Sequence, residues 1–161
     1  MSIKFVYSGA SFDVTERYRY QLERTWVERP KNFCNFVMLN PSTADAEVLD
    51  PTVTRCVGYA RDWGYDGLIV TNIFAIRSTD PKGLLLVSAP VGRDNDAAIL
   101  AAAFRSSRVI AAWGTHGKLN DRGRQVAKRL RQALGSDLQC LGVTKHGHPR
   151  HPLYLRRDVQ P

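Results

Sequence analysis

Polar and apolar residues alternate at the start of the chain and then give way to longer apolar runs. Alternation over residues 3–7 and 17–26 predicts two strands, each with one buried face. Tyr18, Tyr20 and Leu22 fall on the same face of the second segment. We therefore expect an antiparallel hairpin or edge pair, forming an N-terminal β extension over residues 1–30.

Four short apolar runs follow, and each is typical of a strand that is buried on both faces. Segments with apolar residues at helical spacing lie between them, and the first of these helices is expected to start at Asp50 and Pro51, an N-cap followed by proline. Gly64 and Gly135 mark expected helix ends. The predicted strands are residues 33–39, 67–73, 108–113 and 138–142, and the predicted helices are residues 51–63, 93–105 and 120–134.

This order of elements predicts an α/β fold, because strands that alternate with helices form parallel sheets through right-handed crossovers. We expect a three-layer α/β/α arrangement with a four-stranded parallel sheet. Numbered along the chain, the strands should lie in the order 2-1-3-4. A chain of 161 residues has the length of one domain. Residues 1–161 are therefore predicted to form a single domain with its core at 33–154.

Composition narrows the class of protein. No apolar run approaches the roughly 20 residues that span a bilayer, and the N-terminus lacks the apolar core of a signal peptide. Cys34, Cys56 and Cys140 are odd in number and lie in apolar stretches, which favours reduced thiols. These features predict a cytoplasmic protein.

Charge is unevenly distributed along the chain. The 23 basic and 15 acidic residues give a net charge of +8. Up to Phe104 the chain carries 11 basic and 12 acidic residues, whereas from Arg105 onward it carries 12 basic and 3 acidic residues. Such asymmetry is compatible with a polyanionic partner or with a solvated basic helix face. We expect the 120–134 helix to carry its basic residues outward.

Candidate site residues follow the predicted strands, and ligands of open parallel sheets bind beyond the carboxyl ends of the strands. Asn40-Pro41-Ser42 can equally form a turn, and Trp113-Gly114 can equally serve core packing. The amide of Asn72 requires a partner, either structural or a ligand. The residues expected to share one pocket are Asn40, Pro41, Ser42, Asp45, Asn72, Phe74, Trp113, Gly114, His151 and Tyr154.

The histidines near the C-terminus raise the question of a metal site. His146, His148 and His151 have spacings that metal ligands can show. A carboxylate is missing nearby, and the charges of Lys145 and Arg150 would repel a cation. We expect neither a metal nor another cofactor.

Longer motifs carry a resemblance over almost the whole chain to the bacterial and phage family known as domain of unknown function 1643. The motifs are Arg-Tyr followed by Leu-x-Arg-x-Trp, Met-Leu-Asn-Pro-Ser-Thr-Ala-Asp, Asp-Pro-Thr-x-x-Arg-Cys, Thr-Asn-Ile-Phe-Ala-x-Arg-Ser-Thr-Asp-Pro, Ala-Trp-Gly and Thr-Lys-x-Gly-x-Pro-x-His-Pro-Leu-Tyr. This resemblance supplies no activity by itself.

More remotely, the order of the rim motifs is similar to that of the uracil-DNA glycosylase superfamily. The matching positions are Asn40-Pro41, Thr71-Asn72, Trp113-Gly114 and His151-Pro152. Members of that superfamily have a four-stranded parallel sheet and remove bases from DNA. Their catalytic Asp-Pro or Asn-Pro segment follows the first core strand, and an Asn at this position lacks the general base that an Asp supplies.

The resemblance implies a role for each matched residue. Asn40 would position the attacking water, Asn72 would bind the edge of a flipped base, and His151 would donate a hydrogen bond to the departing base. Phe74 or Tyr154 would stack on the base. The expected phosphate-binding residues are Arg77, Lys145, Arg122 and Arg124.

The leading hypothesis is a glycosylase-like protein that binds a nucleobase in DNA or a nucleotide and hydrolyses its N-glycosidic bond. Two alternatives stay open. One is a non-catalytic nucleic-acid or nucleotide-binding module, and the other is a different small-molecule enzyme that uses the same sheet rim.

Overall fold

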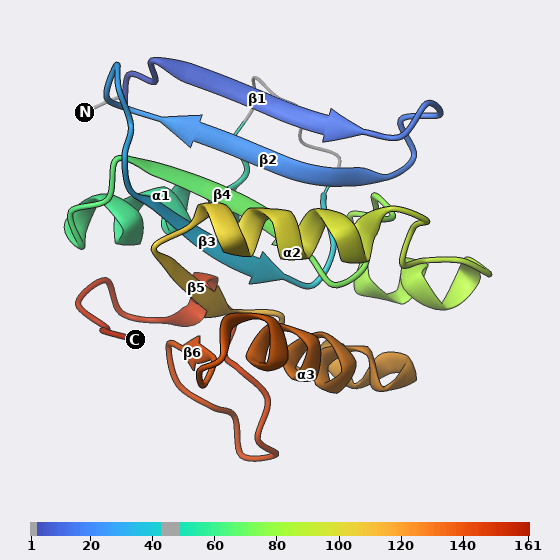
Figure 1. Cartoon of the computed structure of the whole chain (residues 1–161). Coiled ribbons are helices and arrows are strands. Elements are labelled where there is room, and N and C mark those ends of the chain that lie inside the picture. The colour runs from blue at the N-terminus through green and yellow to red at the C-terminus, as the bar shows by residue number, and fades with distance from the viewer. Residues whose placement is uncertain (1–2, 43–48) are drawn as a thin grey trace.

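A six-stranded mixed sheet forms the centre of the computed structural model, which describes residues 3–42 and 49–161 (Figure 1). The strand order is β1-β2-β4-β3-β5-β6. Strand β3 pairs in parallel with β4 and β5, and β6 pairs in parallel with β5, whereas β2 is antiparallel to both β1 and β4. The strands are β1 (Tyr7–Phe12), β2 (Arg19–Thr25), β3 (Phe33–Met38), β4 (Gly67–Asn72), β5 (Arg108–Ala111) and β6 (Gln139–Cys140).

The α/β class predicted from the sequence is confirmed, but the sheet is larger than expected. The N-terminal pair is part of the same sheet, because β2 lies along β4 with Leu22 opposite Val70. Strand β1 begins where the first alternating segment ends, at Tyr7. Strand β6 has only two residues, and Gly142, with φ of +126°, follows it shortly afterwards.

Three α-helices connect or follow the parallel strands: α1 (Pro51–Asp62), α2 (Asn95–Arg105) and α3 (Arg122–Leu134). Three 3₁₀ segments, η1 (Pro81–Leu86), η2 (Thr115–Asp121) and η3 (Pro152–Tyr154), lie in the connections. Asp50 caps α1 as expected, because its carboxylate accepts a hydrogen bond from the Val53 amide at 2.7 Å. Gly135 ends α3 with φ of +66°.

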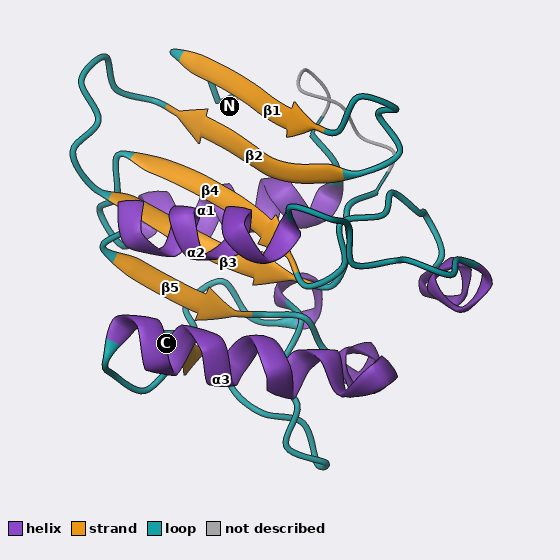
Figure 2. Ribbon diagram, turned by 45° about the vertical axis from the view of Figure 1, so that its right-hand side comes forward, coloured by secondary structure: helices purple, strands orange, loops and turns teal. Residues whose placement is uncertain are grey.

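Helices cover both faces of the sheet, with α1 on one face and α2 and α3 on the other (Figure 2). On the α1 side, the rings of Phe36, Tyr59 and Trp63 stack with centroids 5.3 to 6.3 Å apart. On the opposite side, Ile99 of α2 and Leu130 of α3 share a core cluster with Val37 of β3. This packing leaves the carboxyl ends of β3, β4 and β5 to the loops that follow them.

Among the described residues, none of the helices combines the length and the apolar character that a bilayer span requires.

Candidate functional site

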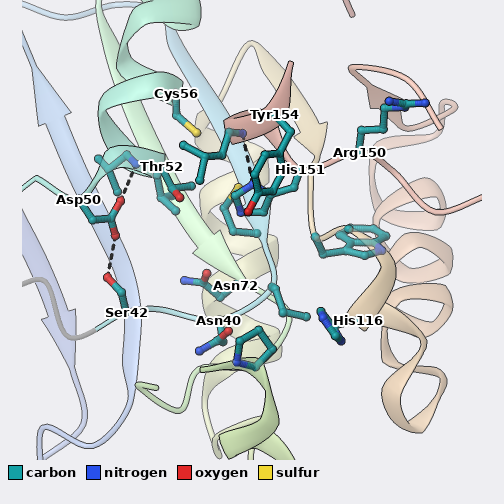
Figure 3. Close-up of a pocket in the computed structure, with 18 of the residues that line it drawn as sticks. Asn40, Ser42, Asp50, Thr52, Cys56, Asn72, His116, Arg150, His151 and Tyr154 are labelled. Atoms are coloured by element: carbon teal, nitrogen blue, oxygen red, sulfur yellow. Dashed lines mark hydrogen bonds between the residues drawn. The ribbon is translucent and has the colours of Figure 1, made fainter. Parts of the chain in front are cut away.

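A pocket of about 550 Å³ opens at the carboxyl ends of β3, β4 and β5 (Figure 3). Loops that are far apart in the chain meet here, since the segments after β3, β4 and β5 and the segment before η3 all line it. Seven of the residues expected at this rim line the pocket: Asn40, Ser42, Asn72, Trp113, Gly114, His151 and Tyr154. The expected convergence of these residues on one pocket is therefore observed.

The other expected residues lie elsewhere. Phe74 is fully buried in the core beside α2 and α3, so its ring is unavailable for stacking on a ligand. Pro41 is buried behind the pocket, and its carbonyl accepts hydrogen bonds from Ser78 and Asn40. Asp45 lies outside the described residues. The expected phosphate ligands Arg77, Lys145, Arg122 and Arg124 do not line this pocket.

Arg122 requires a correction, because it does not belong to the outer face of α3. Its guanidinium donates to the Ile73 carbonyl at 2.8 Å and pairs with Asp96, and the residue is only 4% exposed. Arg122 is therefore a structural cation that joins α3 to α2 and to the end of β4.

Asn72 is the last residue of β4 and is 2% exposed. Its own carbonyl accepts a hydrogen bond from the Asn95 side chain at 2.8 Å, which fixes the backbone at the end of the strand. The side-chain Nδ2 is buried and donates to no atom in the described part of the chain. Asn72 therefore places an unpaired donor against the pocket.

Asn40 follows β3 and has its amide nitrogen fully used. Nδ2 donates to the Ser78 carbonyl at 2.9 Å and to the Pro41 carbonyl at 3.1 Å. These bonds hold the side chain against the segment that precedes η1. The amide oxygen is left as the group that can accept a hydrogen bond from a ligand or a water. Figure 3 draws Asn40 and Asn72 among the residues that line the pocket.

His151 has a defined tautomer. Its Nδ1 accepts a hydrogen bond from the Leu153 amide at 3.2 Å, so in the neutral ring the proton resides on Nε2. Burial lowers the pKa of His151 below the ordinary value of 6.5, while the negative charge of Asp50 acts in the opposite direction. At neutral pH, the ring is therefore an uncharged hydrogen-bond donor.

Asp50 is a functional candidate that we expected only as a helix cap. Of the pocket residues that the structure describes, it is the single carboxylate. Its Oδ2 accepts from the Ser42 hydroxyl at 2.6 Å, while Oδ1 caps α1. The predicted topology could have identified Asp50 as a site residue, because a helix that follows β3 places its N-cap beside the carboxyl end of that strand.

Arg19, in β2, is a second residue that sequence reasoning missed. It is 2% exposed and lines the pocket from the antiparallel part of the sheet. Burial lowers its pKa to about 10, with the Asp50 charge opposing the shift, so the guanidinium is still protonated at neutral pH. The pocket thus contains one buried cation and one carboxylate.

Gly114 and Tyr154 shape the remaining wall. Gly114 has φ of +72°, and its amide donates to the Pro149 carbonyl at 2.9 Å, which ties the end of β5 to the segment that carries His151. The ring of Tyr154 is 6.0 Å from that of His151 and the residue is 84% exposed. Tyr154 is therefore available to stack on a flat ligand at the pocket mouth.

Thiol and metal chemistry have little support in this pocket. Cys56 lines it, but complete burial raises the pKa of its thiol well above the ordinary value, so the thiol is protonated and inert. The described residues contain no cluster of three or more potential metal ligands. Among its described residues, the pocket offers the neutral donors of Asn72 and His151, the accepting amide of Asn40, the Asp50 carboxylate, and two cations, the buried Arg19 and the exposed Arg150, beside the exposed ring of Tyr154.

Comparison with known proteins places the chain in a family. No curated protein and no solved structure gives a significant match. A family model described as "Protein of unknown function (DUF1643)" matches residues 19–153, which include every described pocket residue except Tyr154 and Leu155. Because that match covers most of its length, the chain belongs to the DUF1643 family.

Proposed function

We propose that the pocket binds a nucleobase, in DNA or in a nucleotide, and hydrolyses its N-glycosidic bond. The observation that carries this proposal is the buried Nδ2 of Asn72, which has no partner among the described residues. A buried donor without an acceptor costs about 1–3 kcal/mol. A ligand carbonyl would remove that cost, and every common nucleobase except adenine presents a carbonyl oxygen at its edge.

Other groups in the pocket suit the same ligand. The neutral His151 ring supplies a second donor through Nε2, and Tyr154 offers a ring on which a base can stack. The pocket volume of about 550 Å³ is within the range of small-molecule sites. Asn40, Asn72 and His151 are also among the positions that carry the remote resemblance to uracil-DNA glycosylases.

The proposed reaction adds water across the bond between the sugar C1′ and the base nitrogen. The amide oxygen of Asn40 accepts a hydrogen bond from the attacking water, whose proton passes to the Asp50 carboxylate. As the bond breaks, its electron pair moves to the base, and His151 donates a hydrogen bond to the base oxygen that gains negative charge. Asp50 thereby supplies the general base that an Asn after β3 lacks, and its charge stabilises the positive charge that develops on the sugar.

The test compares DNA oligonucleotides that differ at one position. Single-stranded oligonucleotides carry uracil, hypoxanthine or a normal base at one site, and a matched oligonucleotide carries a stable abasic analogue. We expect at least one base to raise the affinity of the wild-type protein tenfold or more over the abasic oligonucleotide. Release of that base, detected as an alkali-labile site, would establish hydrolysis.

Asn72→Asp is the informative variant, because it replaces the Nδ2 donor with an oxygen of similar size. It should reduce the preference for the base over the abasic analogue about tenfold, which corresponds to about 1.4 kcal/mol. Asn120→Asp, at an exposed position of η2, is the matched control. Equal affinity of the wild-type protein for all base-bearing and abasic oligonucleotides would refute the proposal, and tight binding of free nucleotides alone would favour a small-molecule enzyme.

A further inference from the structure

A second cavity, of about 940 Å³, lies between α3, the η2 segment and the loop 143–149. It shares one wall residue, Trp113, with the first pocket. Four cations line it, and we call their surface the basic groove: Lys118, Arg124, Lys128 and Arg131. In Figure 1, α3 and the loop that borders this cavity lie next to each other at the β6 side of the sheet.

The positive charge of the basic groove is largely uncompensated. Asp121 is the one carboxylate among the described residues that line it, and it approaches Arg124 at 3.8 Å with both side chains mostly exposed. An exposed ion pair of this kind contributes little to stability. Lys118, Lys128 and Arg131 form no ion pair with any described residue.

The opposite side of α3 is different. Arg122 and Arg129 both pair with Asp96 of α2, so these cations are used within the fold. The basic residues of α3 therefore divide into two that face α2 and pair with Asp96 and a set that lines the groove, in which only Arg124 has an acidic partner among the described residues. A basic helix face that served only solvation would not require this separation.

The cations of α3 that line the groove form a row rather than a cluster. Arg124, Lys128 and Arg131 are spaced i, i+4 and i+7, which places them on successive turns, about 6 Å and 4.5 Å apart along the helix axis. A single phosphate group is best held by cations that converge on one point. A row along a groove instead suits a chain of phosphates.

We propose that the basic groove binds the phosphodiester backbone of a DNA strand whose base occupies the first pocket. This inference rests on the proposed function and identifies its ligand as a polynucleotide rather than a free nucleotide. Trp113, which lines both cavities, is the point where the backbone would pass from the groove to the pocket. Of the four cations, Arg124 was among the residues expected to bind phosphate, and the groove adds Lys118, Lys128 and Arg131 to it.

The test measures the affinity of the full chain for a fluorescent single-stranded DNA oligonucleotide as a function of salt. The variant is Lys128→Gln/Arg131→Gln, in which both positions are exposed. We expect binding at least tenfold weaker at low salt. The log–log salt slope should be smaller in magnitude by about 1.4, since each phosphate contact to a single strand contributes about 0.7.

The matched control is Arg29→Gln/Lys31→Gln, which removes the same two charges from exposed positions before β3, at the amino ends of the parallel strands. This variant should bind nearly as the wild-type protein does. Equal loss of affinity in the two double variants would overturn the proposal, because the effect would then reflect net charge alone. Wild-type affinity and salt slope in the groove variant would overturn it as well.

The experiments distinguish an error in the proposal for the groove from an error in the proposal for the pocket. If the groove is wrong but the pocket is right, Asn72→Asp abolishes base preference while Lys128→Gln/Arg131→Gln leaves affinity and salt slope unchanged. If the groove variant weakens binding to base-bearing and abasic oligonucleotides equally, the groove contacts the backbone, as phosphate contacts carry no base information. Absence of salt-dependent DNA binding by the wild-type protein refutes the groove even if free nucleobases bind the pocket.

Discussion

The side chains of Asn72 and His151 show how local hydrogen bonds prepare residues at the rim to bind a ligand. Asn72 has a buried donor without a partner among the described residues, and His151 uses one ring nitrogen to accept from the Leu153 amide. Each is held by its own backbone surroundings before any ligand arrives. Such preorganisation reduces the cost of ordering these groups on binding.

His151 gives a pH-dependent prediction. Because burial lowers its pKa below 6.5, the unfolded chain binds a proton near pH 6 that the folded chain does not bind. The contribution of this group therefore makes the free energy of unfolding fall as the pH decreases from 7 towards 5. Urea denaturation should show a smaller decrease for His151→Gln than for the wild-type protein. An NMR titration that places the pKa of His151 at or above 6.5 would contradict the prediction.

At the scale of elements, the start of α1 links stability to the pocket. The Asp50 carboxylate caps the helix through Val53 and also accepts from Ser42 across the loop. The residue that begins the helix is thus the carboxylate of the pocket, as Figure 3 shows. A substitution here affects two properties that can be measured separately.

Asp50→Ala should lower the free energy of unfolding by about 1 kcal/mol, because the cap is lost. Asp50→Asn should retain most of that stability, since an amide oxygen can still accept from Val53, but it removes the negative charge from the pocket. Chemical denaturation checks both values. Asp94→Ala is the control, because Asp94 precedes α2 without a side-chain cap bond and should change stability little. A similar loss at Asp94 would show that capping is not the cause.

At the scale of the whole molecule, Arg122 joins three elements that are distant in the chain. It leaves α3, contacts Asp96 of α2 and donates to Ile73 just after β4. Asn95 holds the neighbouring Asn72 carbonyl, so this network supports the backbone from which the Asn72 donor extends.

Arg122→Met should therefore lower the free energy of unfolding by about 2 kcal/mol, because it removes a buried charged hydrogen bond to the Ile73 carbonyl, which keeps only the longer bond from Asn95 at 3.3 Å, and one of the two cations that pair with Asp96. Arg129→Met removes the other, largely exposed partner of Asp96 and should cost less than about 1 kcal/mol. Thermal and urea denaturation of the two variants give the comparison. Equal effects would mean that burial does not decide the importance of these pairs.

The sequence by itself determined the elements whose signals are local. Apolar runs identified the positions of β3, β4 and β5, while Asp50 and Gly135 marked helix limits through capping rules that depend on a few neighbouring residues. The rule for parallel sheets then located seven of the residues that line the pocket. Arg122 was nevertheless misassigned, although its spacing of four from Val126 and eight from Leu130 places it on the buried stripe of α3.

Only the tertiary structure decided which distant segments became neighbours. Strand β2 joins β4 through backbone hydrogen bonds, which carry no side-chain signature, so the alternating pattern predicted a hairpin but not its place in the sheet. The burial of Arg19 follows from that pairing. Which cations of α3 pair with Asp96 and which line the groove depends on where α2 packs. These features arise from contacts between elements, and a pattern along one chain does not encode the partner of each contact.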